Sequence, residues 1–229
     1  MRILFTRYGY HELLIFSALF ALLAVLTGFF IWWPLAVVFG VPLCIVVWFF
    51  RDPPRKVPDE EDVVVAPADG TITDITDVEN AEFIDGPATR IGIFLSIFSV
   101  HINRAPYAGT TKYLKYHPGK FFAAMRPRAS SENESNSVGM ALPDHDNKKI
   151  LIKQISGVIA RRIVCTCREG DTLSRGEKFG MIKFGSRTEL FIPRDLPFEP
   201  SVRVGQKVRA GSSIVGRFLP AARQTQPDG

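Results

Sequence analysis

The sequence predicts a mostly β protein of the α+β class, in which a compact β domain follows an N-terminal hydrophobic helical hairpin. Two observations carry this prediction. Residues 13–50 contain no charged side chain, and a run of that length can form membrane-embedded helices. From residue 63 onwards, short apolar runs alternate with Gly, Pro and Asp, which is the pattern of short strands joined by turns. The 229 residues are enough for one large domain with an appendage.

The uncharged run is expected to form two helices. As one helix it would measure about 57 Å, nearly enough for two crossings of a bilayer core about 30 Å thick. Pro34 breaks the run because proline removes a helix donor and clashes with the preceding turn. We expect helices at about 12–32 and 35–50. Since the second is short, a full span and a shallow re-entrant hairpin both remain open. A cleaved signal peptide would be shorter and end in a small-residue exit.

Basic residues flank the hairpin on both sides. Arg2 and Arg7 precede it, and Arg51, Arg55 and Lys56 follow it. Because basic flanks favour the cytoplasmic side, we expect anchoring in the cell (inner) membrane with the bulk of the chain in the cytosol. A net charge of +5 suits a domain held beside anionic lipid. A nucleic-acid partner is disfavoured, because the sequence contains no dense cluster of basic residues interleaved with aromatic residues.

The remainder is expected to be a linker and a β domain. Residues 51–62 are rich in proline and charge and are interpreted as the linker, and residues 63–229 as the domain. Strands are expected in the apolar runs at 63–66, 71–75, 90–98, 111–116, 149–155, 158–167, 180–184, 188–192 and 213–218. A helical stretch is expected around 119–126, and loops at 129–138 and 142–148.

A faint internal repeat occurs in the second half. Residues 169–176 and 204–211 share a Gly-x5-Gly spacing, and each is followed by an apolar run. Glycine suits positions where φ is positive, so the repeat predicts two equivalent turns. The pattern is typical of the hairpins of biotinyl/lipoyl-type carrier domains, and we expect such elements here.

The cysteines predict no metal site. Cys44 lies in the uncharged run, and Cys165 and Cys167 alternate on what is expected to be one face of a strand. A Cys-x-Cys pair with no nearby His or Cys pair is weak evidence for a metal. Buried or half-buried thiols are the favoured interpretation.

The most informative bond is Gly185–Ser186, between two expected strands. Gly-Ser is either an ordinary turn or a point at which a chain cuts itself. Self-cleavage would make Ser186 a new N-terminus and a source of a pyruvoyl group. That ketone would supply an electrophile to a sequence with no motif for a bound cofactor.

Three further residues are candidates for acid–base chemistry. His101 ends a very apolar run and His117 precedes a turn; histidine serves as a proton donor or acceptor near neutral pH. Asp69 lies in an Asp-Gly turn dipeptide. Asp69, His101 and Ser186 together would supply an orienter, a base and a nucleophile. Each of them also has an ordinary structural interpretation.

Several short sequence blocks, taken together and in their order along the chain, resemble those of a known family. They are Trp48-Phe-Phe-Arg-Asp-Pro53, Ala66-Pro-Ala-Asp-Gly70, Phe94-Leu-Ser with Val100-His-Ile-Asn-Arg-Ala-Pro106, Tyr116-His-Pro-Gly-Lys-Phe121, Glu132-Asn-Glu134 and Gly180-Met-Ile-Lys-Phe-Gly-Ser-Arg187. With these blocks, residues 48–218 resemble the short, bacterial and archaeal form of phosphatidylserine decarboxylase. The Phe-Gly-Ser-Arg block combined with the Val-His-x-Asn-Arg-Ala-Pro block is highly specific.

The resemblance implies a pyruvoyl-dependent proenzyme that cleaves itself between Gly185 and Ser186. The products would be a β chain, 1–185, and an α chain, 186–229, which remain together as a heterodimer, with further oligomerisation open. The covalent pyruvoyl group derived from Ser186 would form a Schiff base with the amine of phosphatidylserine. Loss of CO2 would then give phosphatidylethanolamine at the membrane.

The resemblance also implies residue roles. His101 matches a family histidine and is expected to deliver the proton after CO2 leaves, and Asp69 is expected to orient the cleavage machinery. Longer family members carry a second histidine, the cleavage base, three residues after the one matching His101. Arg104 occupies that position here. Either His101 serves both steps or His117 supplies the base.

Alternatives of three kinds remain. Archaetidylserine has the same headgroup chemistry and would be an equivalent substrate. A soluble amino-acid decarboxylase would not need the hairpin. A non-enzymatic, membrane-tethered biotinyl-like adaptor is disfavoured because a carrier needs a modifiable lysine at a hairpin tip, and Lys183 is the nearest approach.

Overall fold

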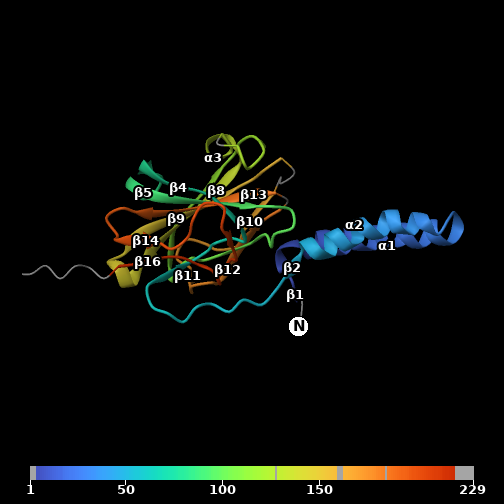
Figure 1. The fold of residues 1–229 in the computed structure, drawn as a ribbon, viewed down its shortest axis with the longest axis horizontal. Helices are drawn as coiled ribbons and strands as arrows, with labels where there is room; N and C mark the ends of the chain where they lie inside the picture. Colours follow the sequence, from blue (N-terminus) through green and yellow to red (C-terminus); the bar gives the residue numbers. More distant parts are fainter. Residues whose placement is uncertain (1–3, 127, 159–161, 184, 220–229) are drawn as a thin grey trace, which may run out of the picture.

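The structure, a computed structural model, describes residues 4–126, 128–158, 162–183 and 185–219. Figure 1 shows a β domain from which two apolar helices project together on one side. The domain is mostly strand, and the helical hairpin precedes it in the chain. The predicted α+β class is therefore confirmed.

The hairpin consists of α1 (Tyr10–Phe30) and α2 (Pro34–Phe49), preceded by a short 3-10 helix η1 (Arg7–Gly9). The helices begin and end within two residues of the expected bounds, and Pro34 occupies the first turn of α2, where its missing N–H costs nothing. Residues 7–30 form the one described helix that is long and apolar enough to cross a membrane, with a mean hydropathy of 2.6. At ~1.5 Å per residue, α1 is about 31 Å long and matches the bilayer core.

The root of the hairpin is tied to the β domain. Strand β1 (Leu4–Phe5) pairs with β2 (Arg51–Asp52), so the two ends of the hairpin meet. A buried apolar cluster joins the root to the domain; its members are Tyr8, Leu13, Phe49 and Phe50 from the hairpin side and Val100, Ile102 and Met181 from the domain. The hairpin therefore has a fixed attachment to the region around residue 101.

An eight-stranded antiparallel sheet forms the body of the domain. Its order is β11-β7-β8-β9-β13-β5-β4-β15. The strands are β4 (Gly70–Ala81), β5 (Gly86–Leu95), β7 (Gly109–His117), β8 (Ser135–Leu142), β9 (Lys148–Ile155), β11 (Thr172–Leu173), β13 (Ser186–Pro193) and β15 (Lys207–Val208). All eight residues of β13 are buried, because β5 and β9 flank it on both edges.

Two three-stranded sheets accompany the large one. One has the order β10-β12-β6, with β6 (Ile102–Arg104), β10 (Ile163–Cys165) and β12 (Lys178–Ile182). The other has the order β14-β16-β3, with β3 (Val63–Val65), β14 (Phe198–Pro200) and β16 (Ile214–Phe218). Apolar residues from all three sheets form one core, in which Ile93, Ile152 and Leu190 are fully buried.

The Gly-x5-Gly repeat is present in the structure as two matching turns. Gly170, Gly176, Gly205 and Gly211 all have positive φ, between 70° and 94°. Each turn encloses a two-residue strand, β11 or β15, and leads to a longer strand, β12 or β16. A side chain on Gly211 would contact the backbone of Gly176, so the two turns pack against each other. The predicted equivalent turns are confirmed.

Two local predictions are wrong. The expected loop at 129–138 instead contains α3 (Ala129–Glu132) and the beginning of β8. Its polar side chains pair inside the fold: Asn136 Nδ2 donates to Gln154 Oε1 at 2.9 Å and Ser137 Oγ to Glu82 Oε2 at 2.7 Å. The polar composition of this segment therefore did not indicate an exposed loop, because residues 135–138 are buried in β8.

The second error is the helix expected at 119–126, where the described backbone is irregular. The Asn133 side chain replaces helical bonding there. Its Oδ1 accepts from Phe122 N and its Nδ2 donates to Phe122 O, both at 2.8 Å. Of the strand expected at 158–167, only β10 is present among the described residues, and residues 159–161 lie outside them, as does residue 184 of the expected strand at 180–184.

Candidate active site

Gly185–Ser186 lies at the entrance to the central strand β13. Gly185 has φ +55°, a left-handed conformation that favours glycine over other residues. Ser186 opens β13 and pairs with Leu95 of β5. The backbone therefore bends at Gly185 and leads directly into a strand whose eight residues are all buried.

The Ser186 side chain is fully buried, and its Oγ has no hydrogen-bond partner among the described residues. Burying a hydroxyl without a partner costs about 1–3 kcal/mol. The Ser186 hydroxyl therefore does not stabilise the folded state, and a buried polar atom without a structural partner often has a chemical role. Ser186 is a candidate nucleophile on this ground.

His101 lies against Gly185, the residue before Ser186. Its Nε2 accepts a hydrogen bond from the Gly185 amide at 3.3 Å, and its Nδ1 donates to the Ser99 carbonyl at 2.9 Å. This pair of bonds defines the neutral tautomer with the proton on Nδ1. Burial, reinforced by the nearby Arg51 charge, outweighs the bond to Ser99 and lowers the pKa of His101 to about 4. The ring is therefore unprotonated at neutral pH, and its Nε2 lone pair is directed at the Gly185 amide.

A buried amide network fixes β6, and with it His101, over the sheet. Asn103 Nδ2 donates to Thr188 Oγ1 at 3.0 Å, and Gln154 Nε2 donates to Asn103 Oδ1 at 2.9 Å. Alternate residues of a strand share a face. His101, two residues before Asn103, therefore lies on the side of Asn103, and its ring contacts Gly185, three residues before Thr188.

The end of β9 runs alongside the Gly185–Ser186 bond. Ile155 pairs with Arg187, which places Ser156 next to Ser186 and on the same face. A Cβ at Gly157 would overlap the Gly185 carbonyl oxygen, so the missing side chain makes room for that carbonyl. The Ser156 hydroxyl is also buried and has no partner among the described residues.

Several of these residues were not assigned roles from the sequence. Asn103 was quoted only as part of a block, and Ser156 and Gly157 carried no signal, because a lone Ser-Gly looks like any turn. Their importance comes from strand register, which pairs segments distant in the chain. Finding Ser156 and Gly157 would have required knowing that residues 155 and 187 pair across the sheet.

The structure places the other candidates elsewhere. Asp69 Oδ2 accepts from Arg55 at 2.7 Å and its Oδ1 from the Ala210 amide at 2.8 Å. His117 Nε2 lies 2.9 Å from Glu82 Oε1, and its strand β7 is three strand spacings, about 14 Å, from β13. Among the described residues, no hydrogen bond joins Asp69 or His117 to Gly185 or Ser186.

Arg104 also faces away from the site. It donates to Gly176 O at 2.9 Å and lies 3.4 Å from Asp52 Oδ1. Lys178 pairs with the same carboxylate. The residue three positions after His101 therefore ties β6 to the root of the hairpin.

The thiols lie in the small sheet with β6. Cys165 is half-buried, Cys167 is buried, and their sulfur atoms are 3.3 Å apart. The two thiols therefore lie together as expected, but β10 ends at Cys165 and Cys167 follows it outside the strand. Their mutual hydrogen bond lowers the pKa of Cys165 to about 7 and raises that of Cys167. Among the described residues there is no group of three or more His, Cys, Asp or Glu that could hold a metal ion.

A buried serine, a neutral histidine beside it and a sheet that fixes both are features of an enzyme. The family model for phosphatidylserine decarboxylase matches residues 44–216, and the chain belongs to that family of decarboxylases. A protein from Rhodopirellula baltica is 49% identical over 214 residues, covering 93% of this chain and 88% of its own. One from Magnetococcus marinus is 46% identical over 172 residues, covering 75% and 77%. Both are named phosphatidylserine decarboxylase proenzyme.

Proposed function

We propose that the chain is a proenzyme that cleaves itself at Gly185–Ser186 and then decarboxylates phosphatidylserine to phosphatidylethanolamine and CO2. The observation that carries the proposal is the buried Ser186 hydroxyl, which has no partner among the described residues and follows Gly185, whose amide is hydrogen-bonded to His101. The relatives' name supplies the substrate and the word proenzyme. Neither feature is expected of an adaptor.

His101 serves as the base in the first step. Ser186 Oγ attacks the Gly185 carbonyl carbon, and the hydroxyl proton passes to Nε2 of His101. Nε2 then gives this proton to the Ser186 nitrogen as the C–N bond breaks, which leaves an ester between the two residues and a free Ser186 amine. A pKa of about 4 keeps His101 unprotonated at neutral pH and ready for this transfer. The absence of a Gly185 side chain leaves the approach uncrowded.

The remaining steps convert Ser186. Loss of its α-proton expels the Gly185 carboxylate and leaves dehydroalanine, and water then releases ammonia to give the pyruvoyl group. The fragments 1–185 and 186–229 stay associated because β13 belongs to the second fragment and is paired on both edges with strands of the first. Cutting the bond removes no strand from the sheet.

The site fits a pyruvoyl group at position 186. The group is built from Ser186 itself, whose hydroxyl has no hydrogen bond to lose among the described residues. When present, a pyruvoyl ketone condenses with a primary amine and accepts the electrons released as CO2 leaves. His101 can take a proton from the substrate ammonium and return one to the former α-carbon. Because its pKa is low, it must first gain that proton before acting as the donor.

The hairpin gives this chemistry a membrane location. We assign 1–50 as the anchor, 51–62 as the linker and 63–229 as the catalytic domain, with basic residues on both sides of the anchor placing the domain in the cytosol. The fixed root of the hairpin lies next to the residues before His101. A lipid substrate therefore needs to move little to reach the site.

Intact-mass analysis of the purified protein tests the proposal. We expect two fragments divided after residue 185, the smaller beginning with pyruvate, and a single full-length chain for Ser186→Ala. The second Gly-Ser bond, Gly211–Ser212, is a matched control, since Gly211 also has positive φ while its amide donates to the Ala66 carbonyl. Ser212→Ala should still be cut after Gly185. An active preparation consisting of intact chain would overturn the proposal.

A further inference from the structure

A polar recess of about 590 Å³ lies beside the candidate site, at the sheet edge formed by β4 and β15. Three cations line it: Arg51, Lys207 and Arg209. Hydroxyl groups complete the wall, contributed by Thr71, Ser96, Ser99 and Ser213. Such a lining offers charge and hydrogen-bond donors to one anionic group.

The positive charge of this recess is not neutralised. Among the described residues, none of the three cations forms an ion pair with a carboxylate. Asp69 is the one acidic residue in the lining, and its two oxygens already accept from Arg55 and the Ala210 amide. The recess is therefore short of negative charge.

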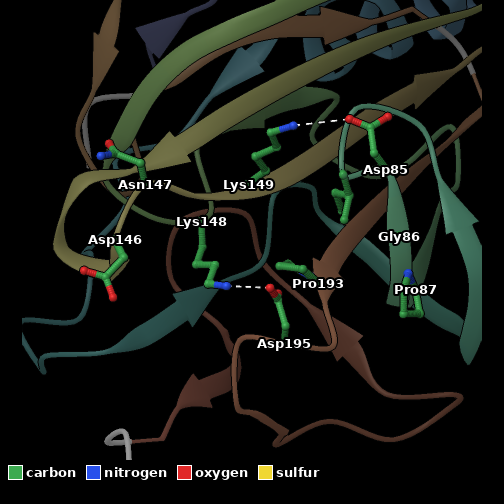
Figure 2. A pocket seen from close by; sticks show the side chains of 10 residues that line it. Asp85, Gly86, Pro87, Asp146, Asn147, Lys148, Lys149, Pro193 and Asp195 are labelled. Carbon is green, nitrogen blue, oxygen red and sulfur yellow. Dashed lines mark hydrogen bonds and ion pairs between the residues drawn. The ribbon is translucent and has the colours of Figure 1, made fainter.

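A second recess, at the opposite end of β13, provides a contrast. It measures about 520 Å³ and is also lined by two lysines, Lys148 and Lys149. Figure 2 shows each of them reaching a carboxylate, Lys148 to Asp195 and Lys149 to Asp85. The lysines of this second recess are therefore paired with carboxylates, unlike the cations of the first recess.

The unpaired recess adjoins an apolar groove of about 500 Å³ between α2 and the segment before His101. Ile97 and Phe98 line that groove together with Cys44, Ile45 and Trp48 of the anchor. Phe98 also lines the polar recess, so it forms a wall shared by both. Its side chain is 67% exposed, next to a helix suited to lipid.

Arg51 joins the two spaces. It donates to Trp48 O and to Phe98 O, each at 2.7 Å, and its guanidinium carbon lies 4.1 Å from the Trp48 ring centroid. A tryptophan–arginine contact at the end of an apolar helix is typical of a membrane interface. The groove therefore lies on the acyl side of this interface and the recess on the headgroup side.

The recess also lies next to the reacting bond. Ser99 lines it, and the Ser99 carbonyl accepts from His101, whose other nitrogen meets the Gly185 amide. In a phosphoserine headgroup only a short serine unit separates the phosphate from the amine. A phosphate in the recess would therefore leave the amine close to residue 186.

We propose that these two spaces form one phospholipid site, with the phosphate diester held by Lys207, Arg209 and Arg51 and an acyl chain in the groove along α2. The proposal rests on the proposed function for its choice of substrate. Beyond that function, the proposal identifies the residues of this chain that bind the lipid. Phe98 then lies at the level of the glycerol backbone.

Binding of a lipid without an amine tests this site independently of the pyruvoyl group. The full chain in uncharged maltoside micelles is titrated by calorimetry with dihexanoylphosphatidic acid, dihexanoylglycerol and inorganic phosphate. The test variant is Lys207→Gln/Arg209→Gln, and the control is Lys148→Gln/Lys149→Gln, which removes the same charge from the distal recess. Both pairs of residues are at the surface, so neither change should unfold the domain.

The expected result is a dissociation constant for dihexanoylphosphatidic acid raised about tenfold in the test variant, since two charge-assisted contacts are lost, and changed less than twofold in the control. Dihexanoylglycerol should bind weakly and equally to all forms, and inorganic phosphate more weakly than the phosphorylated lipid. Equal behaviour of the two variants would overturn the site. Phosphate binding as tight as lipid would overturn the lipid part.

Turnover gives a second readout. In mixed micelles of phosphatidylserine, the test variant should raise the apparent KM by a similar factor while still cleaving after Gly185. A wild-type chain that neither cleaves nor releases CO2 would contradict the proposed function. A wild-type chain that does both, with a test variant identical to the control in KM and in lipid binding, would contradict this inference alone.

Discussion

The Gly185 amide nitrogen lies 3.3 Å from Nε2 of His101, although the two residues are 84 positions apart in the chain. The bond identifies the imidazole nitrogen that faces the scissile region and leaves the other nitrogen to the Ser99 carbonyl. One histidine thus has a defined tautomer, a lowered pKa and a position beside the candidate nucleophile. Under the proposed function, His101 is the residue that we assign to both cleavage and decarboxylation.

His101→Gln should prevent or strongly slow self-cleavage. Glutamine can keep a hydrogen bond to the backbone, but it cannot accept the Ser186 proton, and loss of a general base typically costs about 10²–10⁴ in rate. A pulse-chase gel of newly made chain measures the rate. Cleavage at the wild-type rate would show that another base acts.

His117→Gln should cleave normally. Its ring lies beside Glu82 on a strand three spacings from β13, too far for proton transfer to Ser186. The same pulse-chase gel compares the two variants directly. A block in His117→Gln together with normal cleavage in His101→Gln would reverse the assignment left open by the sequence.

The lowered pKa of His101 predicts a pH dependence of stability. Burial holds the folded-state pKa at about 4, below the usual 6.5 of the unfolded chain, so the unfolded chain binds more protons between these values. Stability should therefore fall as the pH is lowered from 6.5 to 4, by up to about 3 kcal/mol from this group. Well above pH 6.5, where the histidine is unprotonated in both states, the group contributes no slope.

Denaturant unfolding of Ser186→Ala, which keeps the chain intact, measures this effect in micelles. The matched control is Ser186→Ala/His101→Gln, which lacks the titrating ring and should lose less stability over the same interval. Identical pH profiles for the two proteins would show that His101 does not titrate with a lowered pKa.

Gly157→Ala should slow cleavage by displacing the scissile carbonyl. The added Cβ would overlap the Gly185 oxygen, and a displacement of about 1 Å in a reacting group can cost about 10² in rate. Gly86→Ala is the control, because a Cβ there meets no atom within 4 Å. Full-speed cleavage in Gly157→Ala would mean that the carbonyl does not need its present position.

Much of the fold could be predicted from the sequence because its signals are local. The uncharged run, Pro34 and the paired glycines each determine backbone within a few residues, and α1, α2 and the two matching turns follow. Strand β8 was missed because its polar residues find partners on other strands. Composition within a window cannot reveal such partners.

The candidate site was predictable only in part for the same reason. Ser186 and His101 carry reactive groups and stand in recognisable blocks, whereas Ser156 and Gly157 matter only because β9 pairs with β13. Asp69 looked like an orienter, yet its carboxylate is held by Arg55 and the Ala210 amide. Pairing across the sheet decides which polar residues meet, and a single sequence does not contain that information.

Asn103→Ala should both destabilise the domain and slow cleavage. The side chain bonds to Thr188 and Gln154 in a fully buried network, and leaving those partners unsatisfied costs about 1–3 kcal/mol. Because Asn103 holds β6 over β13, the same loss should loosen His101 against Gly185.

A double-mutant cycle with Thr188→Val separates these two effects. If the Asn103–Thr188 bond positions His101, the two single variants should slow cleavage by similar factors, and the double variant should be little slower than either. Thr110→Val is the control, since this threonine pairs with Thr172 at the far edge of the sheet. Fully additive slowing would indicate that Asn103 acts through general stability rather than through the position of His101.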